Sequence, residues 1–217
     1  CSGLAKDLKI RLGLPVKKIR YSNCINDVLG DSDYLSIEST KSNRSDHNAV
    51  SIELDNGSSM HYDLIVSTVP LGCMQKGDVE FVPALPKRKS QAIKRMGAGN
   101  LNKVVLEFRS CFWNPDDDIF GRVGESGSNR GHAYMFASFV SNQSAVLTAF
   151  MAGNAAEEME KKSDAEVVDG VLEVLRNMYG KEIVTKPISS HVSMWGKDQY
   201  ARGAYSYVAV GSNGDDY

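Results

Sequence analysis

The chain has 217 residues, 42% of them hydrophobic and 24% charged, a composition typical of globular proteins and a length that can bury one large or two small cores. Its formal net charge of −2 provides no overall attraction to nucleic acid or to anionic membranes, and no apolar run approaches the roughly 20 residues that span a bilayer. The four cysteines and four histidines are dispersed without metal-ligand spacing, which argues against a metal site or a disulfide framework and for reduced thiols in a cytosolic or nuclear setting.

The first third of the chain is predicted to consist of strands. Apolar and polar residues alternate imperfectly over residues 16–21 and cleanly over 49–54, and residues 34–38 form a further short candidate. The sequence Asp55-Asn56-Gly57 then predicts a hairpin with a type I′ turn, because Asn-Gly tolerates the positive φ angles of that turn. Residues 60–62 would be the return strand.

Residues 63–70 show a different pattern, a continuous β-branched apolar run that ends at Pro70. Such a run is typical of a strand buried on both faces of an α/β sheet, and proline ends it because proline cannot donate to the ladder. Strands of this kind commonly carry ligand-binding loops at their carboxyl ends. We therefore predict a buried strand here that leads into a ligand loop.

The rest of the chain is predicted to alternate between helices and strands. We expect helices over 87–96, 155–162 and 164–179, and strands over 101–108, 132–140 and 145–152. The last helix is the clearest, because its apolar residues recur at helical spacing. Ser163 and Glu166 have the spacing of a capping box at its start, and Gly180 is a typical helix end.

Lys103 is the first candidate for a chemical role, because it lies at the mouth of the apolar strand 101–108, just after Gly97 and Gly99. We expect it to be partly buried, and desolvation lowers the pKa of a buried lysine, which favours proton handling. The alternative is that Lys103 merely extends into solvent beside the strand end. The two glycines lack the third glycine and the preceding strand of a dinucleotide fingerprint, so a helix exit that needs glycine freedom explains them better.

A second candidate is the aromatic group Trp195, Tyr200, Tyr205 and Tyr207, interleaved with glycines. From the residues alone, this group fits either ordinary edge packing or the wall of a ligand site.

Three segments carry a resemblance to a known family. Residues 81–108, including Gly99-Asn100-Leu101-Asn102-Lys103, closely resemble the flavin-containing amine oxidases, most of all the lysine-specific histone demethylases. The run 201–209 resembles the segment before the last flavin-binding stretch of that family, and residues 68–72 resemble the segment that returns to the cofactor. The likeness extends over about residues 4–217.

The resemblance implies an α/β fold, the FAD-dependent amine oxidase fold. Residues 1–99 would form part of the FAD-binding domain, 100–213 the mixed-sheet substrate domain, and 214–217 the start of the return to the FAD-binding domain. Because the chain begins with Cys1 and contains no G-x-G-x-x-G phosphate-binding fingerprint, we expect it to be a fragment of a longer protein that is inactive in isolation.

The resemblance also implies roles for individual residues. Lys103 would hold a water near the reactive N5 of the flavin, Tyr205 would form one side of an aromatic cage for the amine, and Trp195 would shape the cavity beside the isoalloxazine edge. Cofactor contacts would come from Val16, Thr68, Val69, Trp195 and Tyr200.

The implied reaction is hydride transfer from a methylated lysine to the flavin, with hydrolysis of the resulting imine to formaldehyde and with O2 as the final acceptor. The implied partners are a methylated histone tail or another amine, together with corepressor or chromatin proteins, in the nucleus. Two departures concern the substrate: Ala137 follows Phe136 where the demethylases usually have tryptophan, and Tyr200 replaces a more usual tryptophan or phenylalanine. A polyamine oxidase and a chromatin scaffold without catalysis therefore stay open as alternatives.

Overall fold

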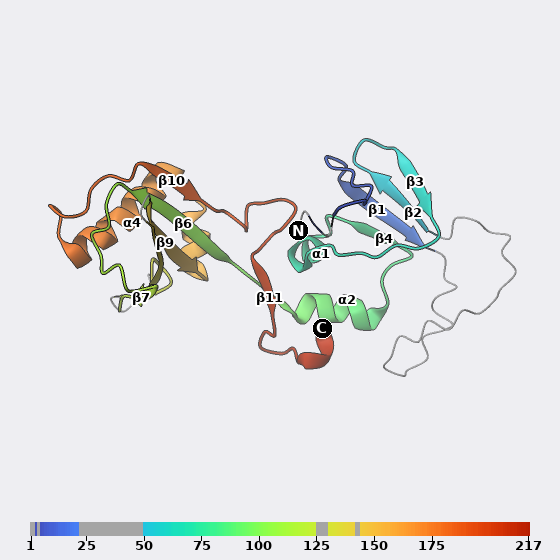
Figure 1. Cartoon of the computed structure of the whole chain (residues 1–217). Coiled ribbons are helices and arrows are strands. Elements are labelled where there is room, and N and C mark those ends of the chain that lie inside the picture. Colours follow the sequence, from blue (N-terminus) through green and yellow to red (C-terminus); the bar gives the residue numbers. More distant parts are fainter. Residues whose placement is uncertain (1–2, 4, 22–49, 125–129, 142–143) are drawn as a thin grey trace, which may run out of the picture. The chain divides into compact units, whose positions relative to one another are not determined.

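The computed structural model describes residues 3, 5–21, 50–124, 130–141 and 144–217 (Figure 1). The chain divides into two compact units, one made of Cys1–Val69 and Cys73–Lys94 and the other of Pro70–Gly72 and Arg95–Tyr217. Each unit is described by itself below.

The first unit is built on a four-stranded sheet with the order β3-β2-β1-β4. Its strands are β1 (Val16–Tyr21), β2 (Val50–Leu54), β3 (Ser59–Tyr62) and β4 (Glu80–Val82), and β4 runs parallel to β1 while the other pairs are antiparallel. The short helix α1 (Leu71–Lys76) and the helix α2 (Lys87–Arg95) follow β3 and β4 in the chain. Gln75 Nε2 donates a 2.8 Å hydrogen bond to the Ile93 carbonyl and so ties these two helices together.

The predicted hairpin of the first unit is confirmed, but its turn is of another type. Gly57 has a positive φ of 79°, whereas Asn56 does not, so the two positive angles of a type I′ turn are not present. Leu54 N donates to Ser58 O at 2.9 Å and Gly57 N to Leu54 O at 3.0 Å. The loop is therefore the three-residue kind, in which a single glycine takes the left-handed position.

The prediction of a buried strand at 63–70 is wrong. In the structure this segment has no regular secondary structure, and its apolar side chains are largely exposed, with Leu64 at 70% and Val66 at 83%. A buried parallel strand needs hydrogen-bonded neighbours, and no strand among the described residues pairs with this one. The predicted strand at 34–38 lies outside the described residues.

The second unit is built on a five-stranded antiparallel sheet with the order β10-β6-β9-β8-β7. Its strands are β6 (Leu101–Phe108), β7 (Ile119–Gly121), β8 (Met135–Val140), β9 (Ala145–Ala152) and β10 (Ser189–Val192). The predicted strands 101–108 and 145–152 are confirmed at both ends, and β8 begins three residues later than predicted. The central pair β6 and β9 is in full register, with Lys103 opposite Phe150.

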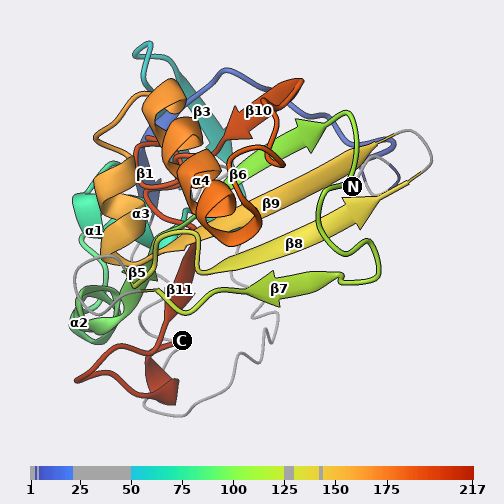
Figure 2. The same cartoon turned by 90° about the vertical axis from the view of Figure 1, so that its left-hand side faces the viewer.

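One face of this sheet is sealed by helices (Figure 2). Alternate residues of β6 and β9, such as Leu106 and Leu147, are fully buried against Val171 and Leu175 of helix α4 (Asp164–Tyr179). The capping box of α4 is confirmed, because Ser163 Oγ accepts from the Glu166 amide at 3.3 Å and Ser163 N donates to Glu166 Oε2 at 2.9 Å. The shorter helix α3 (Asn154–Met159) contacts β9.

The opposite face of the sheet is open. The intervening residues of the same strands, such as Val105 on β6 and Thr148 and Phe150 on β9, are only partly buried. The regular alternation of the strands thus separates a helix-covered core from a partly exposed surface.

A two-stranded ribbon completes the second unit. Strand β5 (Gly97–Gly99) pairs antiparallel with β11 (Tyr205–Tyr207), and a 3₁₀ turn, η2 (Gly214–Asp216), follows. Within the described part of the chain, no helix has the length and apolar character needed to cross a membrane.

Candidate functional site

Lys103 lies on the open face of the five-stranded sheet. Its side chain is exposed, and its Nζ atom lies 5.7 Å from the centre of the Phe150 ring on the adjacent strand, within the range of a cation–π contact. The prediction that Lys103 is partly buried is therefore wrong. The alternation of β6 directs Asn102 and Val104 to the helix-covered face, so the lysine between them lies on the open one.

The backbone of Lys103 is tied to the segment that carries Trp195. Lys103 N donates to Ser193 Oγ at 2.8 Å, and the Ser193 amide donates to the Lys103 carbonyl at 2.9 Å. Two residues beyond Ser193, the Trp195 amide donates to Asn102 Oδ1 at 2.8 Å. The structure thus brings together two predicted site residues, Lys103 and Trp195, that lie far apart in the sequence.

Gly97 and Gly99 lie beside two tyrosines of the aromatic group. In the β5–β11 ribbon, Gly99 pairs with Tyr205 and Gly97 with Tyr207. A Cβ atom at Gly99 would lie 2.7 Å from the Tyr205 ring, and one at Gly97 would overlap the Tyr207 ring. Neither glycine has a positive φ angle, so our explanation of them as a flexible helix exit is wrong. They are required because two aromatic rings lie directly against the backbone.

A cavity of about 210 Å³ lies beside this ribbon, within the second unit. It is lined by Pro70, Leu71, Gly72, Ala98, Ala201, Gly203, Ala204, Tyr205 and Ser206. Gly72 packs so closely against the backbone of Arg202 that a Cβ atom would overlap it. Residues 70–72 and 201–206, which belong to two of the segments that carry the sequence resemblance, therefore meet at this cavity.

The cavity fits part of a flavin. Its lining of small residues allows a flat ring to approach the backbone, and Tyr205, which borders it, is 51% exposed and offers an aromatic surface that a ligand can cover. Its volume is below the roughly 300–1,000 Å³ of sites for complete drug-sized ligands, so it can accept only a portion of a dinucleotide such as FAD.

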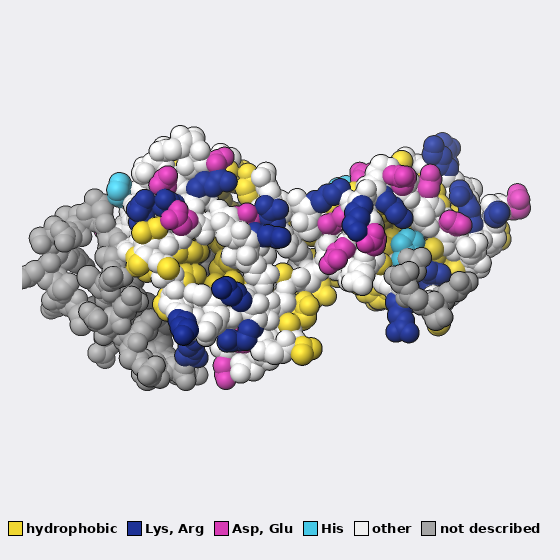
Figure 3. Space-filling view, turned by 180° about the vertical axis from the view of Figure 1, so that it is seen from behind, with side chains coloured by type: hydrophobic (Ala, Val, Ile, Leu, Met, Phe, Trp, Pro, Cys, Tyr) yellow, Lys and Arg dark blue, Asp and Glu magenta, His cyan; other side chains and the backbone are white. Residues whose placement is uncertain are grey.

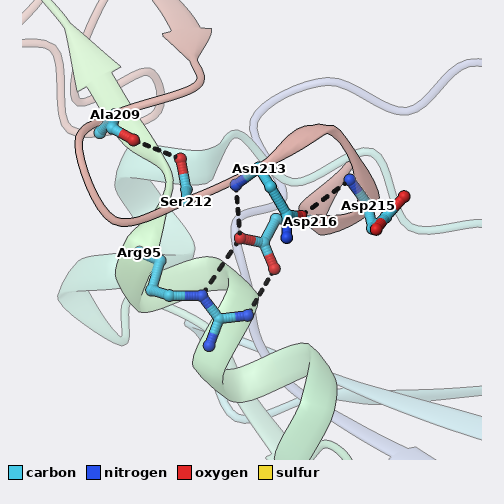
Figure 4. A network of polar contacts seen from close by, with 6 residues as sticks. All are labelled: Arg95, Ala209, Ser212, Asn213, Asp215 and Asp216. Carbon is cyan, nitrogen blue, oxygen red and sulfur yellow. Dashed lines mark hydrogen bonds and ion pairs between the residues drawn. The ribbon is translucent and has the colours of Figure 1, made fainter.

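The turn that follows the ribbon is fixed by an ion pair (Figure 4). Arg95 Nε donates to Asp216 Oδ2 at 3.1 Å and its Nη2 donates to Oδ1, and this bonding raises the pKa of Arg95. The Asn213 amide also donates to Asp216 Oδ2, and the Asp215 amide to Asn213 Oδ1. Thus Arg95, two residues before β5, and the turn after β11 are anchored to each other.

The other predicted cofactor residues are placed as follows. Tyr200 is 59% exposed in the second unit, and its amide donates to Asp198 Oδ1 at 2.7 Å. Val16, Thr68 and Val69 belong to the first unit, where Val16 opens β1 and the other two lie in the irregular segment after β3. Their roles stay predictions.

One polar cluster in this region, formed by Asn100, Asn102 and Glu160, was not predicted from the sequence. Asn102 is fully buried, Glu160 is 8% exposed, and the two side chains are joined by a 2.7 Å hydrogen bond. A signal was present, because Asn102 occupies an inward position of a strand whose other inward residues, Val104, Leu106 and Phe108, are apolar.

Surface charge adds no further candidate on the face of the second unit that Figure 3 shows. Lysine and arginine side chains are interspersed there with aspartate and glutamate. Among the described residues, no three histidine, cysteine, aspartate or glutamate side chains gather as a metal site would require.

Comparison with protein families gives a match over residues 3–217 to the flavin-containing amine oxidoreductases. The protein named Lysine-specific histone demethylase 1 homolog 1 of Arabidopsis thaliana is 42% identical over 218 residues, which cover 99% of this chain and 23% of that protein. The Possible lysine-specific histone demethylase 1 of Drosophila melanogaster is 38% identical over 226 residues, with the same two coverages. The chain thus spans about a quarter of the length of these relatives.

Solved structures of amine oxidases have a similar fold. A triple mutant of putrescine oxidase superposes with a TM-score of 0.67 and 18% identity, over 96% of this chain and 40% of that one. Cyclohexylamine oxidase from Brevibacterium oxydans gives a TM-score of 0.59 and 17% identity, over 90% of this chain and 37% of that one. The α/β amine oxidase fold and the family resemblance expected from the sequence motifs are confirmed.

Proposed function

Because the chain belongs to the family of flavin-containing amine oxidoreductases, we propose that it forms the substrate-facing part, and some of the cofactor-binding part, of an FAD-dependent histone lysine demethylase. The names of its sequence relatives support the histone substrate and a nuclear location. The observation that carries the proposal is the exposed Lys103 on an open sheet face, tied through Ser193 to the Trp195 segment and lying a few residues from the ribbon that bears Tyr205.

The residues present suggest separate roles in binding water, substrate and cofactor. Lys103 has three N–H donors on an exposed ammonium group, so it can hold a water molecule on the open face of the sheet. The exposed aromatic surfaces of Trp195 and Tyr205 can guide a cationic amine by cation–π attraction. FAD would supply the hydride acceptor, and the resemblance assigns contacts with it to Val16, Thr68, Val69, Trp195 and Tyr200.

The domain boundaries from the sequence are part of this proposal. We assign residues 1–99 to the FAD-binding domain, 100–213 to the substrate domain and 214–217 to the return toward the FAD-binding domain. The two compact units of the structure change over at Lys94 and Arg95, close to the first boundary.

The substitution Lys103→Met tests the proposal. The protein is produced from its complete coding sequence and loaded with FAD, and formaldehyde release from a methylated histone H3 peptide is measured. We expect turnover to fall roughly 10²–10⁴-fold, the range for loss of a proton-handling group, while the flavin absorbance per protein is retained. Lys181→Met, at an exposed position, is the matched control and should retain full turnover. Undiminished turnover by Lys103→Met would contradict the proposal.

A polyamine oxidase is the second candidate, and Ala137 is the observation that favours it. This residue is half-buried on β8 and pairs with Ile119 on one side and Thr148 on the other. A small side chain there leaves room that the tryptophan usual in the demethylases would fill. Spermine is therefore assayed in parallel: turnover of spermine alone would establish the polyamine reading, and absence of bound flavin would favour a scaffold.

A further inference from the structure

We propose that Asn102 and Glu160 are positioning residues that fix Lys103 relative to Trp195. The role of Lys103 itself rests on the function proposed above, whereas the contacts that lock it in place are observed in the structure. Neither Asn102 nor Glu160 is expected to touch the substrate, because both are buried on or beside the helix-covered side of the sheet.

Glu160, which follows helix α3, is the centre of the cluster. Its Oε1 atom accepts three hydrogen bonds, from Asn100 Nδ2 at 2.9 Å, from Asn102 Nδ2 at 2.7 Å and from the Gly196 amide at 2.8 Å. Burying a carboxyl group is costly unless hydrogen bonds replace its water shell. Three donors from two separate segments satisfy this need, and in return they hold the segments in one relative position.

Asn102 connects Glu160 to the backbone of Trp195. Its Nδ2 group donates to Glu160, and its Oδ1 atom accepts from the Trp195 amide at 2.8 Å and from Ser193 Oγ at 3.4 Å. The same Ser193 oxygen accepts from the Lys103 amide. Asn102 and Lys103 are consecutive, so hydrogen bonds that fix Asn102 on the inner face also fix the position of the Lys103 backbone, from which its side chain extends on the outer face.

Gly196 allows the cluster to close. A Cβ atom at this position would lie 2.6 Å from Glu160 Oε2 and 2.7 Å from Asn100 Nδ2. The turn after Trp195 can therefore approach the carboxylate only because residue 196 has no side chain.

The choice of residues points to positioning rather than to stability alone. The next three inward positions of β6, Val104, Leu106 and Phe108, are ordinary apolar core. Replacing a whole buried polar cluster by apolar residues of similar volume is often neutral or stabilising, so stability alone does not explain why this cluster is polar. Directional hydrogen bonds fix the register of two segments, which apolar contacts do less well.

The first test measures, without an activity assay, whether the hydrogen bonds of Glu160 and Asn102 hold the segment 193–196 in place. Amide hydrogen exchange is followed by mass spectrometry in the protein produced from its complete coding sequence, for Glu160→Ala, Glu160→Gln and the control Glu157→Gln, which changes an exposed neighbour on α3. We expect exchange over 193–196 to be at least about tenfold faster in Glu160→Ala, partly restored in Glu160→Gln, and unchanged in Glu157→Gln. Unchanged exchange in a folded Glu160→Ala protein would overturn the proposal.

If Glu160→Ala does not fold, Gly196→Ala disrupts the same cluster from the other side and Glu160→Gln keeps the acceptor oxygen. We expect both to accelerate exchange over 193–196, Gly196→Ala more strongly. Exchange at the wild-type rate in both variants would contradict the inference.

The second test asks whether the effect on catalysis passes through Lys103. The rate of flavin reduction by substrate under anaerobic conditions is measured for a double-mutant cycle of Glu160→Gln and Lys103→Met. We expect Glu160→Gln to slow reduction several-fold when Lys103 is present and by a clearly smaller factor in Lys103→Met. Equal factors in both backgrounds would indicate a merely structural role and overturn the proposal. If Lys103→Met alone leaves the rate unchanged, the proposed role of Lys103 is wrong. The exchange experiment would still decide whether Glu160 and Asn102 hold the segment 193–196 in place.

Discussion

The two faces of the five-stranded sheet are made by the same strands and differ in almost every other respect. On one face, Leu106 and Leu147 are fully buried beneath α4; on the other, Val105 and Thr148 are partly exposed and Lys103 is open to solvent. A shift of a single residue along β6 passes from one face to the other. Stability and the proposed chemistry can therefore be altered separately by substitutions at adjacent positions.

The largest effect on stability is expected from Leu106→Ala on the covered face. Removing a fully buried leucine leaves a cavity and should lower the free energy of unfolding by about 2–5 kcal/mol. Leu101→Ala, on the open face of the same strand, should cost less than about 1.5 kcal/mol, because that side chain is only partly buried. Urea unfolding followed by the fluorescence of the buried Trp113 measures both. Equal losses would show that the two faces do not differ as described.

The second effect concerns tight packing outside the sheet. Gly97→Ala places a methyl group into the Tyr207 ring and should destabilise the protein by about 1–3 kcal/mol. Gly214→Ala is the control, because a Cβ atom there would meet no atom within 4 Å. Thermal unfolding compares the two variants, and equal melting temperatures would contradict the close contact in the ribbon.

The third effect concerns the helix that seals the covered face. Ser163→Ala removes one half of the capping box of α4 and should cost about 1 kcal/mol. Ser190→Ala, at an exposed position of β10, should stay within about 0.5 kcal/mol of the wild type. Urea unfolding distinguishes the two, and a loss at Ser190 as large as that at Ser163 would refute the importance of the cap.

The smallest effect is a pH dependence at His132, a half-buried residue with Nε2 3.7 Å from where a Cβ atom of Gly170 on α4 would lie. Burial lowers the pKa of His132, as do the nearby Arg122 and Lys162, while Glu173 opposes the shift. Below the ordinary value of about 6.5, the unfolded chain binds a proton that the folded protein does not.

The contribution of neutral His132 to the free energy of unfolding is therefore fully present above about pH 6.5. It is lost as the pH falls toward the lowered pKa of the folded state. The substitution His132→Gln should flatten the curve of unfolding free energy against pH in this range. The free energy is measured by urea unfolding at several pH values, and a slope unchanged by the substitution would exclude His132 as its source.

Much of the second unit could be predicted from the sequence, because its signals are local. The alternation in β6 and β9 and the helical spacing in α4 gave the ends of these elements correctly, and the Ser163–Glu166 cap was visible as two residues at fixed spacing. The same alternation places Lys103 on the open face between two inward residues, so the prediction that it is partly buried is wrong.

The errors and omissions share another cause, dependence on distant partners. The apolar run at 63–70 has the composition of a buried strand, but composition does not supply the neighbours that such a strand needs. The three-residue strands β5 and β11 are strands only because they pair with each other. The cluster around Glu160 forms only when the segments near residues 100, 160 and 196 come into contact. A local sequence pattern cannot predict such a contact.

The ion pair between Arg95 and Asp216 joins positions that are 121 residues apart. During synthesis at about 5–20 residues per second, Asp216 follows Arg95 by roughly 6–24 s. For most of that interval β11 has not yet been made, so β5 lacks the strand with which it pairs. A strand of sequence Gly-Ala-Gly is a poor template for pairing with another strand in its place. The glycines that leave room for the tyrosine rings in the folded protein therefore also make β5 a weak site for pairing with any other strand.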